Sequence, residues 1–233
     1  MAQSVPPRTL HELADGVYVW IQPGGESGVS NAGVIVDDDG LTIVDTMMVR
    51  SQWEPFAEAV KALDLPMRRI VLTHGHIDHV GGTKAFPHAG VFASPQTSAV
   101  LDQHMPIDAY KTFMSAFEDE FDDLAELGTR AVTHLIDGAA QLTGRIEVLP
   151  ASGHTAGDLL VLVADTDVCF AGDLCFFGVT PLAFQGDPSA IPPGPWDSWV
   201  ERDRDAINVE RAALLAEGRD EMPPSMLKAI GFG

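Results

Sequence analysis

The stretch that decides the fold of this chain is Thr73-His74-Gly75-His76-Ile77-Asp78-His79, which places three histidines and one aspartate within six positions. It follows directly on the apolar run 69–72, which is typical of a buried strand, and Gly81-Gly82 then indicate a loop. Imidazole nitrogen and carboxylate oxygen are preferred ligands of Zn²⁺ and similar metals, and the end of a rigid strand can hold ligands in place. The stretch therefore predicts a metal site at the end of a core strand, rather than a solvated loop rich in histidine.

The composition is that of a folded chain of 233 residues, enough for one large domain or two small ones, with 45% hydrophobic residues. Its net charge of −20 argues against a nucleic-acid partner, because binding to phosphates needs basic patches. No apolar run approaches the roughly 18 residues of a membrane span, and residues 1–8 lack the features of a secretory signal. We expect a cytoplasmic protein with no membrane association, in which Cys169 and Cys175 are small buried hydrophobes.

Strand and helix signals alternate along the chain. Strands are expected at 16–21, 31–36 and 41–45, and the turn residues 37–40 make the last two a hairpin. Apolar spacing predicts a helix over 51–63, with a capping box between Ser51 and Glu54 and with Pro66 as its stop. The remaining expected elements are strands at 69–72, 91–93, 131–136, 145–149, 159–164 and 168–171, a helical region at 95–127 and a helix at 196–217. This mixture indicates an α/β or α+β sandwich.

The helical region 95–127 has apolar residues on one face, among them Tyr110, Phe117 and Phe121, and acidic residues on the other. A helix of this kind either packs on the core or forms a lid that gives an apolar wall to a substrate pocket. Both interpretations stay open.

Two further polar positions follow predicted strands. His154 lies in the glycine-rich stretch 152–158, and Asp173 ends the stretch 170–173. A single histidine in a loop is more often a hydrogen-bonded loop residue than a ligand. Together with 73–79, however, these residues occupy three strand exits, and strand exits are where ligands converge in sheet-based enzymes.

In combination and order, the motifs His-x-His-x-Asp-His, Gly-His-Thr and Gly-Asp resemble those of the metallo-β-lactamase superfamily, over about residues 16–187. The resemblance implies an α+β fold, an αββα sandwich of two mixed β-sheets flanked by helices, with metals at one edge. It implies a first metal held by His74, His76 and His154, and a second held by Asp78 and His79, with Asp173 bridging the two. Asp45 also matches a family position, where it either orients a ligand histidine or is a strand-end turn residue.

One departure from the family pattern concerns the second metal. Family members with two metals usually supply one more histidine from a later strand, and here no histidine follows His154. We hypothesise an internal deletion near residue 190 that leaves the C-terminal part incomplete and the second metal weak or absent. The sheet would then have an exposed edge, or a partner chain would cover that edge, as in a homodimer. We expect a metallo-β-lactamase-like domain over 1–190, followed by a Pro-rich connection and a C-terminal helix over 191–233 packed on the same domain.

The resemblance implies a metal-dependent hydrolase. A metal-bound water would attack a small-molecule acyl substrate, such as a thioester, lactone or related ester or amide. Asp173 would orient this nucleophile, and Asp78 would accept its proton or ligate a second metal. One or two zinc ions are expected, with iron or manganese as substitutes; a β-lactam substrate stays open but fits a cytoplasmic chain poorly.

Two other functions are carried as alternatives. One is a persulfide dioxygenase with a single iron on His74, His154 and Asp173, a ligand set that needs no further histidine. The other is a catalytically impaired or non-catalytic family member with an incomplete second site.

Overall fold

A computed structural model describes residues 9–22, 28–103, 106–122, 128–175, 183, 185–187, 197–219 and 223. These residues fall into two compact units, one within 1–151 and 157–172 and the other within 152–156 and 173–233. The expected boundary near residue 190 and the hypothetical deletion lie outside the described residues and stay predictions. Within the described part of the chain, no helix is long and apolar enough to cross a membrane.

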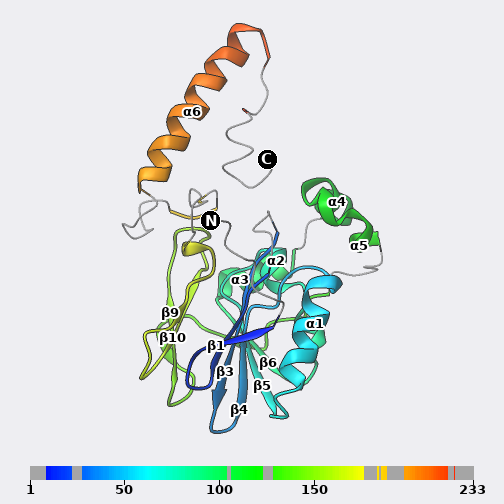
Figure 1. Ribbon diagram of the computed structural model, residues 1–233, viewed down its shortest axis with the longest axis vertical. Coiled ribbons are helices and arrows are strands. Elements are labelled where there is room, and N and C mark those ends of the chain that lie inside the picture. Colours follow the sequence, from blue (N-terminus) through cyan, green and yellow to red (C-terminus); the bar gives the residue numbers. More distant parts are fainter. Residues whose placement is uncertain are drawn as a thin grey trace. The chain divides into compact units, whose positions relative to one another are not determined.

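The first unit contains a seven-stranded sheet in which the strands follow one another in chain order (Figure 1). Its first four strands pair antiparallel, and β4 to β7 pair parallel. The strands are β1 (Leu10–Ala14), β2 (Val17–Trp20), β3 (Ala32–Asp37), β4 (Gly40–Val44), β5 (Met67–Val71), β6 (Gly90–Ala93) and β7 (His134–Leu135). The predicted β3–β4 hairpin is confirmed, with Asp37 opposite Gly40.

A second, four-stranded sheet is antiparallel in its described pairs and has the order β11-β10-β9-β8. Its strands are β8 (Ala140–Gln141), β9 (Ile146–Pro150), β10 (Leu159–Val163) and β11 (Cys169–Phe170). The short strands β1 and β8 were not predicted. Figure 1 shows β9 and β10 on one side of the first sheet and helix α1 (Arg50–Lys61) on the other.

Alternating side chains of the central strands divide between two hydrophobic cores. Ile43 and Ile70 belong to the core on the helix side. Their neighbours Val44 and Val71 belong to the core shared with β9 and β10. Successive side chains of a strand point to opposite faces, so a strand that is apolar at both positions is buried on both sides. The predicted α+β sandwich of two sheets with flanking helices is confirmed.

The helices differ from the expectation in detail. The capping box of Ser51 and Glu54 is wrong: α1 follows Val49, and the side-chain oxygen of Gln52 accepts hydrogen bonds from the backbone nitrogens of Met48 and Val49. Ser51 instead donates from its backbone nitrogen and its hydroxyl to Glu120. The helix ends at Lys61, ahead of Pro66.

The helical region 95–127 is divided into several pieces. They are α3 (Pro95–Leu101), α4 (Ile107–Phe113), a 3₁₀ turn (Ser115–Phe117) and α5 (Glu118–Asp122). Tyr110 and Phe121 are buried in the helix-side core, with ring centroids 5.8 Å apart. The core-packing interpretation is therefore confirmed for these two residues.

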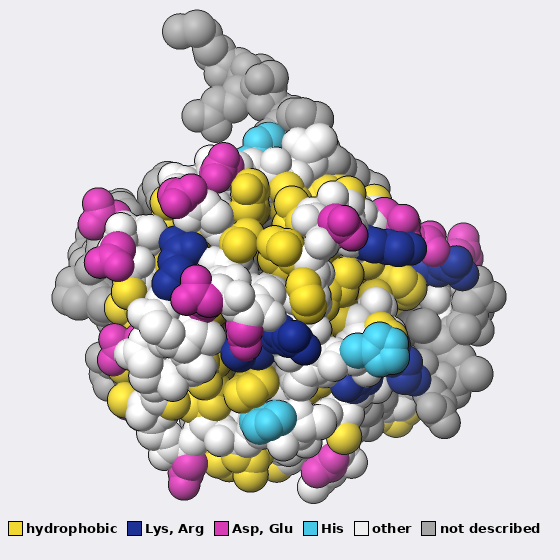
Figure 2. Space-filling view, turned by 90° about the horizontal axis from the view of Figure 1, so that it is seen from below, with side chains coloured by type: hydrophobic (Ala, Val, Ile, Leu, Met, Phe, Trp, Pro, Cys, Tyr) yellow, Lys and Arg dark blue, Asp and Glu magenta, His cyan; other side chains and the backbone are white. Residues whose placement is uncertain are grey.

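The expectation that Cys169 and Cys175 are buried is wrong. Both are exposed: Cys169 lies on the two-residue strand β11, and Cys175 follows a 3₁₀ turn (Gly172–Leu174). On the face shown in Figure 2, hydrophobic side chains lie among both acidic and basic ones. The acidic excess of the chain therefore does not make this face uniformly negative.

Helix α6 (Asp197–Ala216) belongs to the second unit. It agrees with the helix expected over 196–217.

Candidate metal centre

The exit of β5 carries most of the predicted ligands. Leu72 still bonds to β6 through its backbone nitrogen, 2.9 Å from the oxygen of Phe92. The chain then leaves the sheet, and the short helix α2 (Ile77–Val80) begins after His76. This order puts His74 and His76 on the loop and His79 on the helix.

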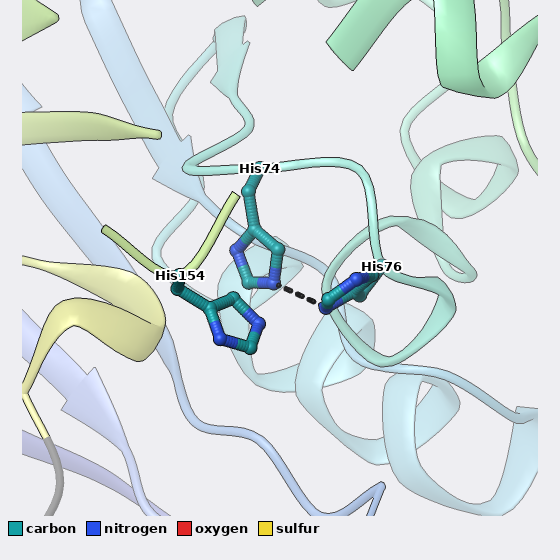
Figure 3. Close-up of side chains that lie close together, drawn as sticks. All are labelled: His74, His76 and His154. Carbon is teal, nitrogen blue, oxygen red and sulfur yellow. Dashed lines mark hydrogen bonds between the residues drawn. The ribbon is translucent and has the colours of Figure 1, made fainter. Parts of the chain in front are cut away.

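The two loop histidines face each other. The Nε2 atom of His74 lies 3.1 Å from the Nδ1 atom of His76, and their rings are nearly perpendicular (Figure 3). His74 is buried and His76 is half-buried. Two ring nitrogens that converge in this way are suited to binding one metal ion between them.

His154 lies on the loop between β9 and β10, and both ends of this loop are fixed. The backbone nitrogen of Ala151 lies 2.8 Å from the oxygen of Asp158, which closes the loop, and the nitrogen of Leu159 lies 2.7 Å from the oxygen of Thr73. Ser94 adds a hydrogen bond of 2.7 Å from its hydroxyl to the oxygen of Gly157. The ligand atoms of His74, His76 and His154 all lie within 4.8 Å of one another. Figure 3 shows the three side chains close together.

Asp173 follows β11 after a residue that must be glycine. Gly172 has φ +52, and a Cβ atom there would lie 2.5 Å from Oγ1 of Thr73. The carboxylate of Asp173 lies 3.4 Å from Nε2 of His154. Asp173 also forms a second potential ligand group with His74 and His79, again within 4.8 Å.

Asp78 is the predicted ligand that neither group of described residues includes. Its carboxylate lies 3.7 Å from Nε2 of His79. Its backbone oxygen accepts a hydrogen bond from the hydroxyl of Ser30. Its role in metal binding or proton transfer stays a prediction.

Asp45 contacts a ligand histidine, as one of its two interpretations required. Its carboxylate lies 2.8 Å from Nδ1 of His79, and it also accepts hydrogen bonds from the backbone nitrogen and the hydroxyl of Thr73. Asp45 has φ 58, which is uncommon for a residue other than glycine, and its nitrogen bonds to the oxygen of Val71. Thr73 was not singled out in the sequence; the only signal was a hydroxyl residue directly before the first histidine.

The donor set fits a transition metal such as zinc. Three imidazoles converge, a carboxylate stands beside them, and one ligand histidine is held through its other nitrogen by a buried carboxylate. Three protein ligands leave room for a water, which is the arrangement of catalytic rather than structural zinc sites.

Comparison with known proteins identifies the family of this chain. The family model described as "Metallo-beta-lactamase superfamily" matches residues 25–219. The chain belongs to the metallo-β-lactamase superfamily. It is thus a metallohydrolase of this fold.

Two relatives and one solved structure illustrate the similarity. The uncharacterized protein YobT of Bacillus subtilis is 26% identical over 210 residues, which cover 87% of this chain and 82% of that protein. The hydroxyacylglutathione hydrolase GloC of Haemophilus influenzae is 27% identical over 152 residues, 64% of this chain and 68% of that protein. A beta-lactamase domain protein from Burkholderia ambifaria superposes with a TM-score of 0.60 at 17% identity, covering 99% of this chain and 88% of that one. The last likeness concerns the fold alone.

Proposed function

We propose that this metallohydrolase hydrolyses a small acyl thioester with the help of a single metal ion, zinc in the first instance. The observation that carries the proposal is the convergence of His74, His76 and His154 within 4.8 Å. A metal bound there would lower the pKa of its water to about 7 and so supply hydroxide at neutral pH. Both potential ligand groups include His74, which supports one ion at a time rather than two.

The chain's own residues have distinct tasks in this reaction. The three histidines would bind the metal ion. The carboxylate of Asp173, which lies 3.4 Å from Nε2 of His154, is proposed to accept a hydrogen bond from the attacking water and so orient it. Asp78 is proposed to take up the proton that this water releases. The water oxygen bonds to the acyl carbon, the carbon–sulfur bond breaks, and the thiolate leaves and takes up a proton, so that a carboxylic acid and a thiol result.

The thioester is preferred because hydroxyacylglutathione hydrolases recur among the curated relatives. Those of Aeromonas salmonicida and Shewanella baltica are 28% and 26% identical, and the matches cover 44% and 53% of those proteins. A lactone or another ester or amide is the next substrate class to test. The cytoplasmic location and a homodimer stay predictions.

The test is a turnover assay of zinc-loaded protein against matched thioester, lactone and β-lactam substrates. We expect hydrolysis of the thioester, and loss of at least about 100-fold in kcat/KM for His76→Ala. His88→Ala is the matched control, because His88 is an exposed histidine outside both ligand groups. Equal activity of wild type and His76→Ala, or no thioester turnover by zinc-loaded protein, would refute the proposal.

The contact between His154 and Asp173 is equally compatible with one alternative, the iron-dependent persulfide dioxygenase. Oxygen consumption with a persulfide by the iron-loaded protein, together with no hydrolysis by the zinc-loaded protein, would establish it. A metal-loaded protein that is inert in both assays would indicate the non-catalytic alternative.

A further inference from the structure

The side chain of Thr73 lies between Asp45 and the first ligand histidine. The three residues are almost fully buried, with exposed fractions of 1% for Thr73, 4% for Asp45 and 1% for His74. Oγ1 of Thr73 lies 2.7 Å from Oδ2 of Asp45 and 3.2 Å from Nδ1 of His74. No bulk water is available at this depth to satisfy a group that its neighbours leave unpaired.

The hydrogens in this group can be assigned from donors and acceptors. The carboxylate of Asp45 has only oxygens to offer, and it receives the backbone N–H of Thr73 at 2.8 Å and the Nδ1–H of His79 at 2.8 Å. The hydroxyl of Thr73 has one hydrogen, which it donates in a hydrogen bond to the carboxylate of Asp45. In its contact with His74, the hydroxyl oxygen can therefore only accept a hydrogen bond. The donor in that contact is Nδ1–H of His74.

We infer that Thr73 is a positioning residue that fixes His74 in the tautomer with hydrogen on Nδ1, and so keeps the lone pair of Nε2 for the metal. This inference rests on the metal site of the proposed function. Asp45 fixes the same tautomer of His79 directly, by accepting a hydrogen bond from Nδ1. One buried carboxylate therefore sets the tautomers of two histidines: that of His79 directly and that of His74 through Thr73. A neutral imidazole has one nitrogen with hydrogen and one without, and the partner of the first selects the second as ligand.

The surroundings of Thr73 favour this role over simple packing. The side chain faces Gly172, where any Cβ atom would lie 2.5 Å from the hydroxyl oxygen. The absence of a side chain at residue 172 therefore leaves room for the hydroxyl. A valine at residue 73 would fill nearly the same space but could neither donate to Asp45 nor accept from His74.

The test compares Thr73→Val, which loses the hydroxyl, with Thr73→Ser, which keeps it. Thr42→Val is the matched control, because Thr42 is also fully buried and its hydroxyl has no hydrogen-bond partner among the described residues. Zinc affinity is measured by competition with a chromophoric chelator at pH 7. Loss of an outer partner of a ligand histidine typically weakens metal binding about 10–100-fold.

We expect that loss for Thr73→Val, with Thr73→Ser and Thr42→Val within about threefold of wild type. Thr73→Val binding as tightly as wild type, or Thr73→Ser binding as weakly as Thr73→Val, would overturn the inference. If wild type binds no zinc, the proposed function fails, and a second measurement still decides the role of Thr73. Long-range ¹⁵N–¹H NMR of the metal-free wild type should show hydrogen on Nδ1 of His74; hydrogen on Nε2 would overturn the inference even if Thr73→Val did not fold.

Discussion

Replacing Gly81 with alanine tests how closely the end of the short helix α2 packs on residues 46–48, which lie between β4 and α1. Gly81 follows α2 with φ −60 and ψ −30, and its nitrogen bonds to the oxygen of Ile77 at 2.9 Å. Alanine in such a helical conformation is ordinarily favoured over glycine by about 0.5–1 kcal/mol. Propensity alone therefore predicts a more stable protein.

Packing reverses that expectation. A Cβ atom on residue 81 would lie 2.0 Å from the oxygen, 2.7 Å from the carbonyl carbon and 2.8 Å from the Cα of Met48. These are backbone atoms, so no change of rotamer can move them away. Overpacking typically costs about 1–3 kcal/mol and sometimes more. Because the obstructing atoms are backbone, the upper end of that range, about 3 kcal/mol, applies. After subtraction of a helix preference of about 1 kcal/mol, Gly81→Ala should still lower the free energy of unfolding by about 2 kcal/mol.

The effect should extend to the metal site. The oxygen of His79 accepts hydrogen bonds from the nitrogen of Thr46 at 2.7 Å and from its hydroxyl at 3.1 Å. Moving α2 away from residues 46–48 would strain these bonds and the 2.8 Å contact between His79 and Asp45. Weaker zinc binding should therefore accompany the loss of stability.

The assay is urea denaturation of Gly81→Ala beside Gly144→Ala. No atom lies within 4 Å of a Cβ built on Gly144, so that control should stay within about 0.5 kcal/mol of wild type. A lower midpoint at unchanged slope would show a loss of stability rather than a change in the surface exposed. A midpoint for Gly81→Ala at or above that of wild type would refute the packing argument.

Three other predictions concern stoichiometry and stability. Zinc-saturated protein should hold one tight ion per chain, because both ligand groups share one histidine; two equally tight ions by elemental analysis would contradict this. Arg145→Met should cost about 1–3 kcal/mol in urea unfolding, because the guanidinium donates to the backbone oxygens of Val36 at 2.8 Å and Asp15 at 2.9 Å, and an unchanged midpoint would count against it. Asp39→Asn should cost less than about 1 kcal/mol at pH 7, since this ion pair is partly exposed. Hydrogen bonding from Arg69 holds the pKa of Asp39 below its ordinary 3.8, so the stabilisation is complete above that value and is lost as the pH falls through the lower folded pKa. Stability curves of wild type and variant should therefore converge in acid, and a difference that grows there would disprove the assignment.

Local signals predicted most of the strands, although not the short β1 and β8, because strand formation depends largely on neighbouring residues. The hairpin at 37–40 follows from its turn residues, and β4 and β5 follow from short apolar runs. The helical region 95–127 shows the limit of such signals. Its apolar spacing continues across Met114, yet Met114 has φ −112 and ψ 52, which ends α4 and starts a 3₁₀ turn. A periodic pattern does not reveal where tertiary packing interrupts a helix.

The start of α1 and the two cysteines show a second limit. Residues Ser51 and Glu54 have the spacing of a capping box, but the side chain of Gln52 is the one that accepts a hydrogen bond from the backbone at the start of the helix. Ser51 instead donates hydrogen bonds to Glu120, 69 positions away. Whether a short strand such as β11 buries its cysteine depends on what covers that strand. Neither the hydrogen bonding at the start of α1 nor the exposure of this cysteine can be predicted from neighbouring residues alone.

The convergence of the site depends on contacts of one residue that sequence motifs do not mark. The backbone oxygen of Thr73 accepts a hydrogen bond from the backbone nitrogen of Leu159, the first residue of β10, which follows directly after the loop of His154. Its backbone nitrogen and hydroxyl both bond to Asp45, and its side chain faces Gly172, one residue before Asp173. Each polar group of Thr73 thus fixes a segment that carries a ligand or orients one. The motifs predict which strand exits bear ligands, whereas the distances between those exits follow from hydrogen bonds between residues 28 and 86 positions apart, which only the folded chain reveals.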